Sequence, residues 1–135
     1  MKLISNLSAH NKIYLGFALI WTTIVTVLCL IRSDELLIPK LEKNYDKLGH
    51  SAFHFGITAL WYLYFKHKVA STKKAIMQAF LFSFIYGILI EISQALFTTT
   101  RTADVLDVVA NTTGALMVVG IVMLYRKKTN VIVSK

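Results

Sequence analysis

The sequence is poor in cysteine, proline, glycine and charged residues. Its single cysteine, Cys29, excludes a disulfide framework and a cysteine-rich zinc module. One proline and six glycines in 135 residues exclude collagen-like and low-complexity chains. Charged residues make up 16% of the chain, compared with about 25% in soluble domains, and hydrophobic residues make up 56%. This apolar excess excludes an ordinary soluble protein, because a small domain has much surface that polar groups must cover.

Most of the hydrophobic residues fall into four long runs. The runs cover residues 13–31, 48–65, 75–97 and 105–125. Each is close to the roughly 20 helical residues that cross a bilayer core of about 30 Å. Helices of a soluble bundle carry one polar face each, whereas these runs are apolar nearly all round. We therefore predict an all-α, polytopic membrane protein built as a bundle of four transmembrane helices.

Basic residues are distributed unevenly between the two sides of this predicted bundle. Of the 15 Lys and Arg residues, 10 lie in the two terminal tails and in residues 66–74. By the positive-inside rule, both termini are therefore predicted to be cytoplasmic. The net charge of +8 then reflects topology and attraction to anionic lipid headgroups, and no soluble basic surface indicates nucleic-acid binding. The 10 residues are Lys2, Lys12, Lys66, Lys68, Lys73, Lys74, Arg126, Lys127, Lys128 and Lys135.

Polar residues inside three of the runs form narrow helical stripes. Each stripe falls within an arc of about 80° when successive residues are placed about 100° apart. Because an ionisable side chain at the bilayer centre costs about 2.5–3.5 kcal/mol, we expect the three stripes to face one another. The stripes consist of Lys47, His50, His54 and Thr58, of Ser83, Gly87, Glu91 and Gln94, and of Asp104, Asp107, Asn111 and Gly114.

The positions along each run predict which polar groups meet. His54, Glu91 and Asn111 each lie about 9 Å from the outer ends of their runs, which predicts one polar layer. His50, Gln94 and Asp107 lie closer to the outer surface and form a second predicted layer. Lys47, Arg101 and Asp104 are placed above both layers, at the mouth of an outward-facing pocket.

This region contains three motifs, Asp46-Lys47-x-x-His50, Glu91-x-x-Gln94 and Arg101-x5-Asp107-x3-Asn111-x-x-Gly114. Together they resemble the motifs of the VanZ-like family of small bacterial membrane proteins. The resemblance implies one domain over residues 1–135, a multi-pass protein of the bacterial cytoplasmic membrane and cell envelope. It also implies a link to resistance against the glycopeptide teicoplanin, without implying a reaction.

The chain departs from the family pattern at several positions. His54 stands where an aromatic residue is expected, which weakens any mechanism that depends on His54. Thr99-Thr100 stand where Pro-Gly is common, and Val118 replaces a second glycine.

The preferred interpretation is a site that binds or processes an anionic lipid-linked phosphate. Lys and Arg suit phosphate recognition, and carboxylate and imidazole groups can act as general bases. This interpretation assigns no metal and names no cofactor, and it leaves open whether the protein is an enzyme. The candidate catalytic residues are Glu91, Asp107 and His50, and the candidate ligand-binding residues are Asp46, Lys47, Gln94, Arg101 and Asn111.

Two alternatives remain open from the sequence. His50 and His54, four residues apart on one helix face, could bind a metal with Glu91 or Asp107. A non-catalytic bundle, whose polar groups join its helices or bind a partner or a second copy of the chain, is the other alternative.

Overall fold

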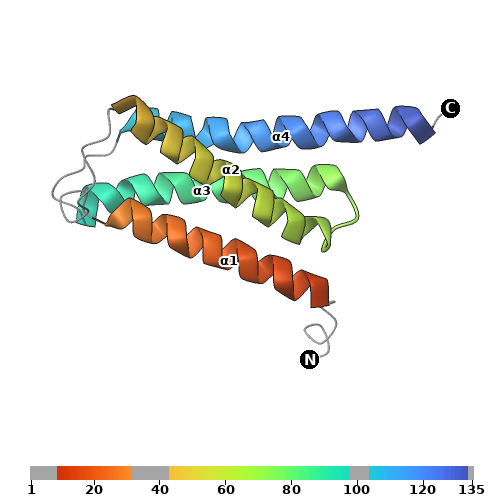
Figure 1. The fold of residues 1–135 in the computed structure, drawn as a ribbon, viewed down its shortest axis with the longest axis horizontal. Helices are drawn as coiled ribbons and strands as arrows, with labels where there is room; N and C mark the ends of the chain where they lie inside the picture. The colour runs from red at the N-terminus through yellow and green to blue at the C-terminus, as the bar shows by residue number, and fades with distance from the viewer. Residues whose placement is uncertain (1–8, 32–42, 98–103, 134–135) are drawn as a thin grey trace.

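The computed structural model describes residues 9–31, 43–97 and 104–133. Over these residues the chain forms four α-helices and no β-strand, which confirms the predicted all-α fold. The helices run antiparallel to one another in sequence order, so that α1 begins and α4 ends at the same end of the bundle (Figure 1). They are α1 (Ala9–Leu30), α2 (Lys43–Lys66), α3 (Thr72–Phe97) and α4 (Val105–Val133).

The helices extend beyond the apolar runs that predicted them. Helix α2 begins at Lys43, five residues before its run, and α4 continues to Val133, eight residues beyond its run. Local capping explains where two helices begin. Asp104 Oδ1 accepts a hydrogen bond from the Leu106 amide at 2.9 Å, at the start of α4. Ser71 Oγ accepts one from the Lys74 amide at 3.4 Å, at the start of α3.

The described helices bury several polar and charged side chains and expose many large apolar ones, unlike the helices of a soluble bundle. Large apolar side chains of α4 such as Leu116, Met117 and Leu124 are exposed. This arrangement suits a protein whose surroundings are lipid, since only the interior offers polar partners. The buried polar and charged residues are His50, His54, Thr58, Ser83, Glu91, Gln94, Asp107 and Asn111.

Three of the described helices, α1, α3 and α4, are long and apolar enough to cross a membrane by length and composition. Helix α2, predicted as a fourth crossing, is long enough with 24 residues but is less apolar than the others. The reason is its polar stripe, which includes the buried residues His50, His54 and Thr58. The mean hydropathy of a helix counts these polar groups as if they faced lipid, although they are buried against other helices.

Helix α1, whose run contributes none of the three polar stripes, packs along α2 and α3. Two of its threonines form hydrogen bonds with aromatic side chains of α2 and α3. The Trp61 indole N–H donates to Thr22 Oγ1 at 3.1 Å, and the Thr26 and Tyr86 hydroxyls lie 2.7 Å apart. Val25 and Ile57 are fully buried between α1 and α2. Helix α1 therefore covers one side of α2.

Candidate functional site

Two glycines allow the backbones of α2, α3 and α4 to approach one another. A Cβ atom at Gly114 of α4 would overlap the main-chain carbonyl of Ser51 in α2. A Cβ atom at Gly87 of α3 would lie 2.9 Å from the imidazole of His54 and 3.3 Å from the amide of Asn111. Because the Ser51 carbonyl belongs to a helix backbone, α2 could make room at Gly114 only by moving away from α4. The close approach brings the three polar stripes together.

The centre of the site is the imidazole of His50, which is 4% exposed. Its Nδ1 donates a hydrogen bond to Asn111 Oδ1 at 3.2 Å and lies 3.7 Å from Glu91 Oε1. On the opposite side of the ring, Nε2 lies 4.0 Å from Asp107 Oδ2. With the proton on Nδ1, Nε2 of a neutral imidazole is a hydrogen-bond acceptor. The predicted convergence of α2, α3 and α4 on one polar cluster is therefore observed, and we call these four residues the His50 cluster.

Lys47 lies three residues before His50 on α2 and contacts one member of the His50 cluster, Asp107. Its Nζ lies 2.8 Å from Asp107 Oδ1 and 3.1 Å from Asp104 Oδ2. Lys47 precedes the apolar run of α2, and its hydrogen bond to Asp107 raises the pKa of the ammonium above its ordinary value of 10.5. Asp104 thus has two roles, since its other oxygen caps α4. The ion pairs join the beginning of α2 to the beginning of α4.

His54 does not join Glu91 and Asn111 in the layer predicted for it. Its Nδ1 lies 2.9 Å from Ser83 Oγ, and its ring lies 5.8 Å from that of Tyr86, so it packs on α3. His50 takes the predicted place of His54. The error arose because depth was counted from the apolar run, whereas α2 begins at Lys43. Counted from the helix ends, His50 is seven residues deep and both Glu91 and Asn111 are six.

The remaining predicted residues lie in different places. The Gln94 side-chain amide donates to the Cys29 carbonyl of α1 at 2.9 Å, so Gln94 joins α3 to α1. Among the described residues, Asn111 Nδ2 has no hydrogen-bond partner although Asn111 is 2% exposed. Arg101 lies outside the described residues. Backbone carbonyls such as those of Ser51 and Cys29 were missed, because a carbonyl group carries no signal in a sequence.

One group of side chains in the described part of the chain has the spacing of a metal site. One ligand atom each from Asp46, His50 and Asp107 lies within 4.8 Å of the others. His50 and Asp107 are buried, and Asp46 is half-buried. The sequence had suggested that His54 would be the second histidine ligand, but His54 is not part of this group.

The family comparison covers nearly all of the described structure. A family model described as VanZ/LLP1 matches residues 9–126, a range that includes the His50 cluster, Lys47 and Asp104. No curated protein and no solved structure matches the chain. The match extends well beyond half of the sequence and agrees with the resemblance carried by the three motifs. The chain therefore belongs to the VanZ/LLP1 family and is a membrane protein of this family.

Proposed function

We propose that the chain is a single-domain, multi-pass protein of the bacterial cytoplasmic membrane, with four crossings and both termini in the cytoplasm. Two observations support this topology. The described basic residues at the start of α1, at the end of α2 and the start of α3, and in the later part of α4 lie at one end of an antiparallel bundle (Figure 1). Helix α2 lies beside α1, α3 and α4, and its 24 residues, at about 1.5 Å each, are long enough for a bilayer core. The His50 cluster then opens toward the outer leaflet.

Reporter fusions test this topology. Alkaline phosphatase, which is active only after export, should be active when fused after Thr100 and inactive when fused after Thr72 or Lys128. The opposite pattern would place the His50 cluster on the cytoplasmic side and overturn the proposed topology.

At the His50 cluster, we propose binding and processing of an anionic lipid-linked phosphate. The observation that carries the proposal is the buried His50 imidazole between carboxylates of two other helices. Ionisable groups inside a membrane are costly and mark functional sites by default. Asn111 Nδ2 supports an anionic ligand, because a buried donor without a partner among the described residues fits a phosphate oxygen.

The geometry suits proton transfer. His50 holds one proton on Nδ1 against Asn111, and its Nε2 can accept a second proton from water or a substrate hydroxyl. Asp107 and Glu91 lie on opposite sides of the ring, where either carboxylate stabilises the imidazolium formed. With a lipid-linked diphosphate, water activated in this way would attack the terminal phosphorus. The bridging P–O bond would break, releasing inorganic phosphate and leaving the lipid monophosphate.

Lipid analysis and a turnover assay test the proposal together. The purified protein should retain a polyprenyl phosphate or diphosphate in mass spectra, and it should release inorganic phosphate from the diphosphate. His50→Gln should lower this release by about 10²–10⁴-fold. The matched control is His10→Gln, because His10 is exposed on α1. Equal retention and release in both variants would exclude the His50 cluster as the site. Teicoplanin tolerance of cells expressing the same variants gives a cellular comparison.

A metal-dependent form of this function is the second candidate. It is favoured by the spacing of Asp46, His50 and Asp107, whose nitrogen and oxygen donors suit divalent transition metals. Lys47 is already paired with two carboxylates, so a cation held there would supply the positive charge that an anionic ligand needs. Elemental analysis of the purified protein should then find one metal per chain, reduced by Asp46→Asn. A metal-free protein that still releases phosphate would exclude this candidate.

A further inference from the structure

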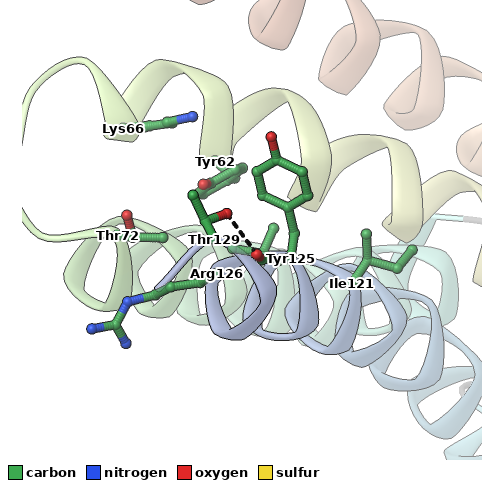
Figure 2. A pocket seen from close by; sticks show the side chains of 8 residues that line it. Tyr62, Lys66, Thr72, Ile121, Tyr125, Arg126 and Thr129 are labelled. Carbon is green, nitrogen blue, oxygen red and sulfur yellow. Dashed lines mark hydrogen bonds between the residues drawn. The ribbon is translucent and has the colours of Figure 1, made fainter. Parts of the chain in front are cut away.

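A cavity lies at the end of the bundle opposite the His50 cluster. It has a volume of about 440 Å³ and lies between α2, the start of α3 and the later part of α4 (Figure 2). Lys66 is sixteen residues beyond His50 on α2, which corresponds to about 24 Å along the helix. The cavity is therefore separate from the proposed site and does not depend on its function. Lining residues include Tyr62, Lys66, Thr72, Ile121, Tyr125 and Arg126.

The charged groups around this cavity are all positive. Lys66 of α2 and Arg126 of α4 both line it. All seven acidic residues of the chain lie between positions 34 and 46 or between positions 91 and 107, away from the segments that form the cavity. Among the described residues, an anionic group in the cavity would therefore meet two cations and no competing carboxylate.

The two cations flank the cavity from different helices (Figure 2). Lys66 Nζ lies 6.0 Å from the centroid of the Tyr62 ring, which places the ammonium over an aromatic face. The stem of Arg126 lines the cavity, and its guanidinium extends outward (Figure 2). Thr72, the first residue of α3, adds a hydroxyl between them. Ammonium, guanidinium and hydroxyl groups are the donors that bind phosphate oxygens.

The rest of the lining is mostly aromatic and aliphatic, apart from Thr129, and continues onto the exposed apolar surface of α4. Ile121 lines the cavity and is 55% exposed, and the neighbouring Leu124 on α4 is 71% exposed. Tyr125 extends from α4 toward α2 (Figure 2). An acyl chain could lie along this surface while its phosphate meets Lys66 and Arg126. Inorganic phosphate would use only the polar part of the cavity.

We propose that this cavity binds an anionic phospholipid, with the phosphodiester between Lys66 and Arg126 and an acyl chain along Ile121 and Val122. Basic pockets between transmembrane helices at the cytoplasmic side are known to suit acidic headgroups. The cations give the preference for an anionic lipid, and the apolar wall gives the preference for a lipid over free phosphate.

Native mass spectrometry of the purified protein tests the proposal. The protein, in detergent, is given equal amounts of phosphatidylglycerol and phosphatidylcholine, and bound lipid is counted on the intact complex. The wild type should retain phosphatidylglycerol preferentially. The double variant Lys66→Gln with Arg126→Gln should weaken this retention roughly tenfold or more. The matched control is Lys127→Gln with Lys128→Gln, which removes the same charge from exposed positions outside the cavity lining.

A third variant tests the contribution of the acyl chain to binding separately from that of the two cations. Val122→Phe places a ring in the cavity and leaves both cations in place, so it should reduce binding of phosphatidylglycerol. Three results would overturn the proposal: equal losses in the double variant and its control, unchanged binding in Val122→Phe, or equally effective competition by inorganic phosphate. Melting curves in detergent should show that all variants remain folded, because the substituted side chains lie at least partly exposed.

Discussion

The two ends of the α2–α4 pair differ in packing and in charge. At the Asp107 end, Gly114 lets the helices touch, and the polar groups are buried and joined to one another. At the Lys66 end the two helices diverge (Figure 1). A cavity lies there, and its cations are the exposed Lys66 and the half-buried Arg126. Burial of ionisable groups in this protein therefore depends on close approach of the helix backbones. Where the backbones separate, the charges remain accessible to a ligand.

The largest expected effect comes from removing the carboxylates of the buried end. Glu91→Leu and Asp107→Leu should each insert normally, because both changes make their helices more apolar. Each should nevertheless lower phosphate release by about 10²–10⁴-fold, since His50 loses a carboxylate neighbour. Thr113→Leu, on the exposed face of α4, is the control and should keep full activity. Full activity in both acid variants would mean that the cluster only joins helices.

The next effect concerns the close approach itself. Gly114→Ala should destabilise the protein by about 1–3 kcal/mol, because its Cβ meets the Ser51 backbone and forces α2 away from α4. Gly120→Ala on the same helix has open space around its Cβ and should stabilise by up to about 1 kcal/mol through helix propensity. Thermal melts in detergent measure both changes. Equal shifts of the two variants would contradict a tight contact between α2 and α4.

A smaller effect distinguishes the two buried histidines. Ser83→Ala removes the partner of His54 Nδ1 and should cost about 0.6–1.7 kcal/mol, the range for hydrogen bonds between membrane helices. Phosphate release should remain unchanged, because His54 contacts α3 and not the carboxylates. The control is Ser93→Ala, since Ser93 bonds only to the carbonyl of Leu89 in its own helix. Lost activity in Ser83→Ala would give His54 a part in the chemistry.

The smallest effect is the pH dependence of the stability that the Lys47 ion pairs provide. The raised pKa of Lys47 means that its ion pairs stabilise the fold fully below pH 10.5 and are lost as pH rises through the higher folded-state pKa. Lys47→Met should therefore melt below the wild type at neutral pH, and the difference should narrow only above pH 10.5. The exposed Lys128→Met is the control. A difference that already disappears near neutral pH would show that the ion pairs do not stabilise the fold.

Part of the site was predictable because helical periodicity is a local property. The stripes through His50, Glu91 and Asn111 follow from spacing alone, and each of these side chains is buried against other helices. Which residue of one stripe contacts which residue of the next could not be predicted to within one helical turn. An apolar run shows where a helix contacts lipid and does not show where the helix begins. Because α2 begins before its run, depths along α2 were counted from the wrong residue, and the contacts of His50 were predicted for His54.

Composition, helical period and motif spacing were enough to predict the class of the protein, its helices, the faces that turn inward and its family, because each can be counted along one chain. The contacts of His50 with Glu91 and Asp107 and the bond of Gln94 to α1 became visible only in the folded chain. The same is true of the basic cavity between α2 and α4 at the Lys66 end. The reason is that the offset and divergence of neighbouring helices are set by packing contacts such as Gly114 on the Ser51 carbonyl. Such contacts join residues far apart in sequence and involve backbone atoms that every residue shares.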